Sequence, residues 1–194
     1  VATTGSIGSL SNTGTLGGVQ FGVNNRGTIG TFNNSGRVTN SNFTALWNQG
    51  SIGQLVNSGT ITNYSWAILN SGTIATLTNS GVIYGAGIGI QNNAVINVLN
   101  NSGTLSGNSA ISGNFGTVIN SGIIKGNVSV YSGTIGTIIG GSNGAVGTFT
   151  GVTPGSQGTI GAASDLTFHS GSLLLNDAIT AVNVQASSIL VSNI

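Results

Sequence analysis

The stretch NSGTITNYSWAILNSGTIATLTNSGVI, residues 57–83, contains one five-residue phrase three times. The phrase begins at Asn57, Asn70 and Asn79, and its glycines are separated by a step of 13 and then by a step of 9. The same alternation of a long and a short step continues on both sides of this stretch. The two steps are therefore the unequal parts of one repeating unit of about 22 residues, a length typical of solenoid repeats.

Alignment of the units on their first glycine places apolar residues in four fixed columns. The columns are Ile7, Ile29, Ile52, Ile74, Ile96 and Val118; Leu10, Phe32, Leu55, Leu77 and Leu99; Leu16, Val38, Ile61, Ile83 and Leu105; and Phe21, Phe43, Trp66, Ile88 and Ala110. A single repeat cannot bury its apolar face without its neighbours. We therefore expect all four columns, including Phe21, Phe43 and Trp66, to face a shared core.

Two polar columns are equally regular. They consist of Asn12, Asn34, Asn57, Asn79 and Asn101, and of Asn25, Asn48, Asn70, Asn92 and Asn114. Stacked asparagine side chains form amide ladders in cross-β structures, so we expect a structural ladder at each of two corners. We also expect these asparagines to tolerate the left-handed conformation, and the glycine near each of them to supply a positive φ for the turn.

Fixed columns at a period of about 20 to 50 residues are the signature of a solenoid. Gly, Asn, Ser and Thr disfavour helices, whereas short runs rich in Ile, Val and Thr between Asn-Gly turns indicate strands. At about 3.3 Å per residue, one unit accommodates three short strands and three corners. The sequence predicts an all-β fold, a right-handed parallel β-helix of about eight coils.

The repeat is regular in residues 1–115 and irregular in residues 116–194, where the glycine spacing changes and the asparagine columns end. We expect the second part to be an irregular continuation of the β-helix or a terminal segment. It contains both carboxylates, Asp165 and Asp177, and the only histidine, His169. The only proline, Pro154, predicts a turn or a short protruding loop.

The composition excludes several classes of partner. Only 3% of the 194 residues are charged, and the net charge is +1, which is no electrostatic footprint for nucleic acid. No apolar run reaches the roughly 20 residues of a membrane span, so we expect no membrane insertion by this segment. The chain lacks cysteine, which removes disulfides and Cys-ligated metals, and it lacks methionine even at position 1, as expected of a processed piece.

Candidate catalytic groups are few. Asp165 and Asp177 are separated by about half a coil, so we expect them on different faces and not across one glycosidic bond. Asp165 and His169 are accompanied by no nucleophile-elbow motif, and the glycines recur without the helix and lysine of a phosphate loop. The aspartates of the Gly-rich Ca²⁺-binding nonapeptide are absent. We therefore expect no enzymatic activity, no cofactor and no metal site.

The outward columns indicate a neutral surface. They carry mainly Ser and Thr, as in Ser6, Thr28, Ser51 and Thr73, or in Thr15, Thr60 and Thr104. Such a surface lacks the charges that keep proteins apart, and many weak contacts in register produce avidity. Trp47, Tyr64 and Tyr84 lie outside the apolar columns, so we expect them to be exposed and available for contact with a partner or a glycan.

The repeated Asn-Ser-Gly-Thr-Ile phrase resembles the passenger domains of bacterial classical (type V) autotransporters, especially repetitive adhesins and vacuolating-cytotoxin-like autotransporters. The resemblance covers residues 1 to about 160. It implies export through the outer membrane, display at the cell surface, and a role in adhesion, self-association or biofilm formation. The implied partners are copies of the chain on neighbouring cells, or a host surface or glycan. No catalytic residue is carried over.

Three alternatives remain at this point. The segment could be the passive stalk of a larger toxin or adhesin, with the activity elsewhere. It could be a carbohydrate-binding or carbohydrate-cleaving β-helix. An ice-binding solenoid would need regular Thr-x-Thr ranks on one flat face, but the outward columns here mix Ser, Thr, Gly, Gln and Asn.

Overall fold

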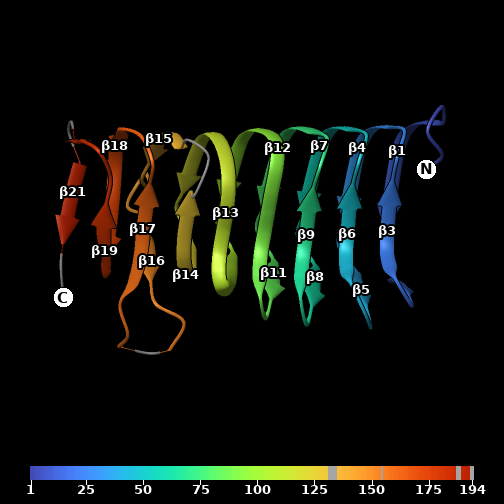
Figure 1. Ribbon diagram of the computed structural model, residues 1–194, viewed down its shortest axis with the longest axis horizontal. Helices are drawn as coiled ribbons and strands as arrows, with labels where there is room; N and C mark the ends of the chain where they lie inside the picture. Colours follow the sequence, from blue (N-terminus) through green and yellow to red (C-terminus); the bar gives the residue numbers. More distant parts are fainter. Residues whose placement is uncertain (131–134, 154, 187–188, 193–194) are drawn as a thin grey trace.

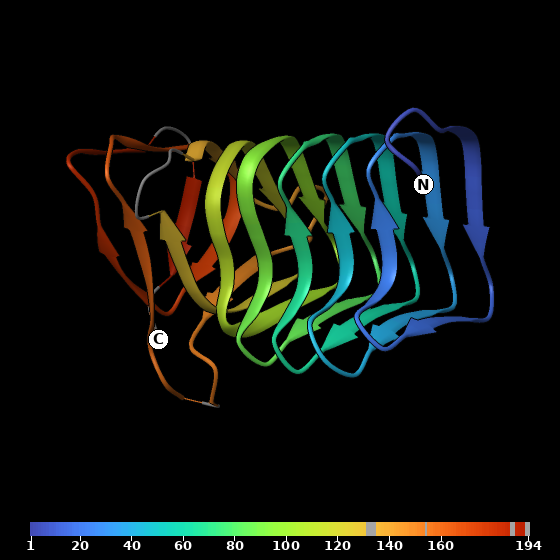
Figure 2. The same ribbon diagram turned by 45° about the vertical axis from the view of Figure 1, so that its right-hand side comes forward.

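The chain winds into a parallel β-helix of about eight coils (Figures 1 and 2). The computed structural model describes residues 1–130, 135–153, 155–186 and 189–192, so the turn predicted at Pro154 lies outside the described residues. Seen from the N-terminal end, the chain runs clockwise as it recedes from the viewer, which makes the helix right-handed (Figure 2). The predicted all-β, right-handed parallel β-helix with coils of about 22 residues is confirmed.

Each coil contributes one strand to each of three faces. The first face contains β1 (Ser6–Asn12), β4 (Thr28–Asn34), β7 (Ser51–Asn57), β10 (Thr73–Asn79), β15 (Ile135–Ile139) and β20 (Val184–Ala186). The second face contains β2 (Thr15–Gly18), β5 (Arg37–Asn40), β8 (Thr60–Asn63), β11 (Val82–Gly85), β16 (Gly147–Thr150) and β21 (Ile189–Ser192). The third face contains β3 (Phe21–Asn25), β6 (Thr44–Asn48), β9 (Trp66–Asn70), β17 (Gly158–Ala162) and β19 (Asp177–Thr180).

Four longer strands continue around corners and contribute to more than one face. They are β12 (Ile88–Asn101), β13 (Thr104–Asn120), β14 (Ile123–Val130) and β18 (Leu166–Leu175). The named strands pair in parallel with the strands of adjacent coils. In the first five coils, equivalent residues stack directly, as in the series Ile7, Ile29, Ile52, Ile74 and Ile96.

The core is a continuous apolar rod inside the coils. The first and second faces supply the three columns that the sequence predicts, with Ile29, Phe32 and Val38 fully buried in the second coil. The third face supplies a different column, consisting of Val23, Leu46, Ile68, Ile90 and Ile111. Every interior coil therefore buries apolar side chains from three directions and is covered by the coils on either side. The first coil has a neighbour on one side only, so its Ile7, Leu10 and Leu16 are partly buried.

The prediction that Phe21, Phe43 and Trp66 belong to the core is wrong. At the corner before the third face, a small and a large residue point inward in succession, as in the pairs Ala45–Leu46, Ala67–Ile68 and Ala110–Ile111. This doublet shifts the in–out alternation by one residue. In the first and third coils, the residue at this position, Phe21 or Trp66, is therefore half-buried at the surface.

Phe43 leaves the column for a second reason. The second coil has one extra residue at this corner, so Thr44, not Phe43, pairs with both Phe21 and Trp66. Thr44 is buried and its hydroxyl donates to the main-chain carbonyl of Trp66 at 2.8 Å. Phe43 projects from the corner and is 36% exposed.

The register changes between the fifth and sixth coils. Asn92 pairs with Gly113, but Ile96 pairs with Phe115, so the chain loses residues at this corner. Asn114 is therefore displaced from the predicted asparagine column. Val118, which was predicted to stack on Ile96, pairs with Leu99. One coil earlier, Ala94 occupies the position that a glycine holds at this corner in the first four coils. The hydrogen bond there, from the Val95 N–H to the Gly72 carbonyl, is 3.2 Å long, whereas the equivalent bonds of earlier coils are 2.8–2.9 Å long.

The later coils vary in length but continue the same solenoid within the described ranges. The coil that separates Thr117 from its partner Thr137 is shorter than the regular repeat, and the coil that separates Thr137 from its partner Thr167 is longer. The added residues lie in loops, of which the one between β16 and β17 projects from the body (Figure 1). At its base, Ser156 accepts from the Gly151 N–H at 3.1 Å, and Asn176 donates to the Ser156 carbonyl at 3.2 Å.

The corner glycines are required by close stacking and not by a positive φ. Among the described residues, positive φ values occur at Gly113, Gly126, Gly144, Gly155, Gly171 and Asn143, none of which belongs to the asparagine ladders or to the regular corner glycines. A Cβ on Gly59 would lie 2.1 Å from the carbonyl oxygen of Gly36 in the coil below. The expected left-handed turn is therefore wrong, and contact between successive coils excludes a side chain.

Candidate functional site

The first asparagine column forms a continuous ladder at the corner between the first and second faces. Each Nδ2 donates to the Oδ1 of the asparagine in the next coil at 2.7–2.9 Å, through Asn12, Asn34, Asn57, Asn79, Asn101 and Asn120. All six side chains are buried. The 22-residue period did not predict Asn120, because Asn120 follows Asn101 at a shorter spacing than the regular repeat. The role of this ladder is structural.

The second column forms a shorter ladder at the corner between the third and first faces. Asn25, Asn48, Asn70 and Asn92 are joined by Nδ2–Oδ1 bonds of 2.7–2.8 Å. The ladder ends there, because Asn92 donates to the main-chain carbonyl of Asn114, whose side chain is exposed.

The corner between the second and third faces holds two further buried asparagines, Asn40 and Asn63. Asn63 donates from Nδ2 to the Oδ1 of Asn40, which is the opposite direction from the two longer ladders. Glycines occupy the equivalent positions in the coils on either side: Gly18 pairs with Asn40, and Gly85 pairs with Asn63. The Thr-Asn dipeptide that ends both strands is the signal in the sequence that could have identified this pair.

The outer surface of the second face alternates from coil to coil. Its outward column reads Thr15, Arg37, Thr60, Val82, Thr104, Ile123, Thr148 and Leu174. A threonine in every odd coil is therefore followed by a longer or more apolar side chain in the next. Val82 and Ile123 are 39% and 43% exposed, so the larger side chains stand out from the sheet.

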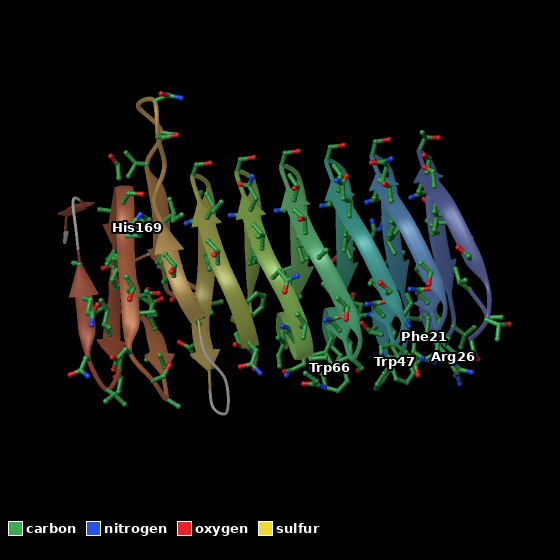
Figure 3. All side chains as sticks on the ribbon, turned by 90° about the horizontal axis from the view of Figure 1, so that it is seen from above. Phe21, Arg26, Trp47, Trp66 and His169 are labelled. Atoms are coloured by element: carbon green, nitrogen blue, oxygen red, sulfur yellow. The ribbon has the colours of Figure 1, made fainter. Side chains whose placement is uncertain are left out.

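Four aromatic side chains gather outside the core on the third face of the first three coils. Phe43 lies at the centre, with ring centroids 5.8 Å from Phe21, 5.9 Å from Trp47 and 5.1 Å from Trp66. Phe21 and Trp47 are also in contact at 5.1 Å. We call these four residues the aromatic cluster. Figure 3 shows Phe21, Trp47 and Trp66 along one edge of the molecule, remote from His169 near the C-terminal end.

One hydrogen bond reaches a ring of the aromatic cluster, and an amide pair lies beside it. The Trp47 indole Nε1 donates to the Ser71 hydroxyl at 3.3 Å. Asn24, which pairs with Trp47 in the sheet, accepts from the Gln49 Nε2 at 3.0 Å. Leu69 pairs with Trp47 on the next strand and is only 6% exposed, although it does not belong to the core. The cluster is therefore part of a small apolar layer on the outside of the sheet.

The three aromatic residues predicted to be exposed occupy different environments. Tyr64, at the corner before Trp66, is 87% exposed, and Tyr84 on the second face is 44% exposed. Trp47 is half-buried in the aromatic cluster. Tyr84 also lines a hollow of about 260 Å³ with Asn108 and Lys125, beside Val152 of the projecting loop.

A further hollow of about 370 Å³ lies on the third face of the later coils. Its lining includes Asn127, Ser129, Thr159 and Thr180, and the Thr159 N–H donates to the Asn127 Oδ1 at 3.1 Å. Its lining residues are hydroxyl, amide or small apolar residues, without a titratable side chain.

The acidic residues lie in different places and have different partners: Asp165 immediately precedes β18, and Asp177 is the first residue of β19. Asp165 is exposed and accepts from the Asn183 Nδ2 at 2.8 Å. Asp177 begins β19 and accepts from the Gly158 N–H at 2.9 Å through Oδ1. Burial raises the pKa of the Asp177 carboxyl, and the Gly158 hydrogen bond opposes that effect. The Asp177 Oδ2 is buried without a hydrogen-bond partner among the described residues.

Within the described ranges, His and Asp side chains do not gather in a group of three or more that could hold a metal ion. The part of the chain that the structure describes contains no helix long and apolar enough to cross a membrane.

Comparison with known proteins gives no relative from which the role of this surface could be transferred. No protein-family model, no curated protein and no solved structure matches the chain, so its function has to be inferred from the side chains described above.

Proposed function

We propose that the chain is a non-catalytic β-helical passenger of a bacterial autotransporter, displayed at the cell surface after export through the outer membrane. Its function is adhesion, through association with copies of itself on neighbouring cells and with host surfaces or glycans. The proposal combines the parallel β-helix with the resemblance of the repeated phrase to such passengers. A rod of this kind would present a long surface with few charges away from the membrane to which we propose it is attached.

The observation that carries self-association is the alternating second face. Threonines in odd coils leave hollows, and larger side chains such as Val82 and Ile123 form knobs in even coils. Two copies that are offset by one coil bring the knobs of one face opposite the hollows of the other. Successive knobs on one face are two rungs apart, about 9.6 Å at the usual inter-strand spacing.

Each contact of this kind is weak, but a rod repeats it in register. Association then depends on the number of coils that engage at once, which is the condition for avidity. Of the charged side chains, Arg37 and Lys125 lie on this face, and Asp165 and Asp177 lie elsewhere. These two cations repel their counterparts on a second copy, but two charges over about eight coils leave the self-repulsion small.

The test combines sedimentation of the purified chain over a range of concentrations with display of the chain on bacteria. We expect concentration-dependent association and clumping of the displaying cells. Thr60→Lys with Thr104→Lys fills two hollows with charge and should abolish both effects. Thr28→Lys with Thr73→Lys, on the first face, is the matched control and should leave them intact. A chain that stays monomeric, on cells that stay dispersed and bind no host surface, contradicts the proposal.

A passive stalk within a larger toxin or adhesin is the second candidate. It predicts that the two lysine variants behave alike, because no face of a stalk binds anything. Incubation with a panel of polysaccharides tests the absence of catalysis, and we expect no new reducing ends and no unsaturated products.

A further inference from the structure

The aromatic side chains of this protein are divided between two places. Four of the six phenylalanines, Phe32, Phe115, Phe149 and Phe168, are buried in the core. The remaining two, together with both tryptophans of the chain, form the aromatic cluster on the outer surface of the first three coils. The rest of the outer surface consists mainly of hydroxyl, amide and glycine residues, so this concentration of rings requires an explanation.

Covering Leu69 does not account for the whole cluster, because a single neighbouring side chain is enough to shield one leucine. Phe43, which touches the other three rings, remains 36% exposed, and Tyr64 at the adjacent corner is 87% exposed. Aromatic side chains that pack against one another and remain in contact with water are typical of a binding surface.

The groups beside the rings are uncharged hydrogen-bonding groups. Asn24 and Gln49 are bonded to each other through one amide group each. No described side-chain contact uses the Asn24 Nδ2 donor or the Gln49 Oε1 acceptor, so both can bind a ligand hydroxyl. Arg26 is the nearest labelled charge in Figure 3, and it lies beyond Phe21 at the end of the row.

This combination matches the chemistry of a sugar. A pyranose ring presents a flat face of C–H bonds, which stacks on an aromatic ring, and a rim of hydroxyls, which exchange hydrogen bonds with amides. Aromatic side chains on three successive coils repeat at about 4.8 Å along the helix axis, which is close to the advance per sugar in an extended pyranose chain. The planes of Phe21, Trp47 and Trp66 lie at 65–88° to that of Phe43, so such a chain meets ring edges as well as ring faces. Neither the four rings nor an uncharged sugar carries a charge, so their contact requires no desolvation of an ion.

The size of the cluster separates a sugar from a protein partner. Three rungs and the length of one five-residue strand give a platform of about 10 Å by about 15 Å. A stable protein interface needs about 800 Å² on each partner, several times this area. Two or three sugars cover the platform completely.

We infer that the aromatic cluster binds a neutral pyranose oligosaccharide of two or three sugars, which pack against the faces and edges of Phe43, Trp47 and Trp66 and hydrogen-bond to Asn24 and Gln49. The inference rests on the adhesive function proposed above and assigns to it a ligand class and a site. It can fail separately, because it concerns soluble sugar and the purified chain and requires no cell clumping.

Tryptophan fluorescence tests it directly, because both tryptophans of the chain lie in the cluster. The purified chain is titrated with neutral gluco-, manno- and N-acetylglucosamine oligosaccharides of increasing length, under excitation that tyrosine does not absorb. We expect a saturable change in the emission with at least one series, and an affinity that rises up to three sugars and then levels off.

Two substitutions at one position separate binding from folding. Phe43→Ser removes the central ring and should weaken binding about tenfold or more, the usual effect of deleting a central aromatic contact. Phe43→Tyr keeps the ring and should bind within about twofold of the natural chain. Val95→Ser, which changes an exposed apolar residue on the first face outside both proposed binding surfaces, is the matched control and should leave sugar binding unchanged. Circular dichroism shows whether each variant keeps its β structure.

Four outcomes overturn the inference. These are no emission change with any neutral series, an unchanged affinity in a folded Phe43→Ser variant, binding of acidic sugars alone, and an emission change produced by raising the protein concentration without sugar. The last would assign the cluster to contacts between copies of the chain. Sugar binding by a chain that does not associate with itself would support the inference and remove only the self-association.

Discussion

At the scale of the residue, one asparagine amide satisfies several backbone and side-chain groups at once. The Asn57 Nδ2 donates to the Asn79 Oδ1 at 2.8 Å and lies 3.2 Å from the carbonyls of Gly59 and Val82. The Asn57 Oδ1 accepts from Asn34 at 2.7 Å. Aspartate has the acceptors but no donor, and leucine has neither. Buried polar groups must be hydrogen-bonded, so asparagine is the residue that fits.

We predict that Asn57→Asp lowers the free energy of unfolding at neutral pH by about 3 kcal/mol or more. The substitution places a buried carboxylate against three oxygen acceptors. Protonation restores a donor, so the loss should shrink as the pH falls. Urea unfolding at two pH values measures both effects. Asn33→Asp, on the exposed side of β4, is the control and should change stability little; equal losses at the two positions would contradict the structural role of the ladder.

The partly buried carboxyl of Asp177 leads to a prediction about pH. Burial raises its pKa in the folded chain above the ordinary value of 3.8, so the protonated form is favoured by folding. Its contribution to stability is fully present below the unfolded pKa and is lost as the pH rises through the folded pKa. We expect Asp177→Asn to flatten the decrease in stability with rising pH over this range. Melting temperatures measured in steps above pH 3.8 test it, with Asp165→Asn as the exposed control.

At the scale of the element, the strands follow from alternation and the corners follow from contact between coils. The regular glycines allow the backbone of one coil to lie directly on the next, and the adjacent asparagine carbonyl accepts two N–H groups there. For example, the Asn34 carbonyl accepts from Ser58 at 2.9 Å and from Gly59 at 3.0 Å. These corners therefore require neither a helical nor a left-handed backbone conformation.

We predict that Gly59→Ala destabilises the chain by about 2–3 kcal/mol, because the new methyl group meets backbone atoms that cannot rotate away. Gly14 occupies the same column in the first coil, and a Cβ there has no atom within 4 Å. Gly14→Ala should therefore cost about 0.5 kcal/mol or less. Thermal unfolding of the two variants gives the comparison. Similar losses would mean that backbone conformation, and not stacking, requires the glycine.

The third face shows where reasoning from the element alone failed. A column of Phe21, Phe43 and Trp66 looks inward in an alignment, because apolar residues repeat there at the same period as the core. The structure turns the column outward, because Ala67 and Ile68 both enter the core at that corner. A corner doublet cannot be recognised from spacing, since it changes no repeat length.

At the scale of the whole molecule, each coil contacts mainly the coils before and after it. Stability is then close to a sum of coil and interface terms. The register makes whole coils interchangeable: Thr28 pairs with Ser51, and Ser51 pairs with Thr73.

We predict that deletion of residues 51–72, one complete coil, leaves a folded β-helix with a modestly lower melting temperature. The deletion joins Gly50 to Thr73, so Asn34 stacks on Asn79 and Asn48 on Asn92. Deletion of residues 51–61, half a coil, places core positions at corners and should abolish cooperative melting. Circular dichroism and thermal unfolding distinguish the two. Unfolding of the chain by the whole-coil deletion would contradict a one-dimensional solenoid.

The sequence by itself determined the fold, the coil length and the first asparagine ladder, because inter-coil contact forces equivalent residues into the same environment and leaves a period that can be read directly. Only the tertiary structure decided the rest: the outward position of Phe21 and Trp66, the replacement of Asn114 by Gly113 in the register, and the extension of the ladder to Asn120. These depend on how the chain bends at each corner. The conformation of each bend depends on its packing against the coil beneath it, and a local pattern of residues does not predict that packing.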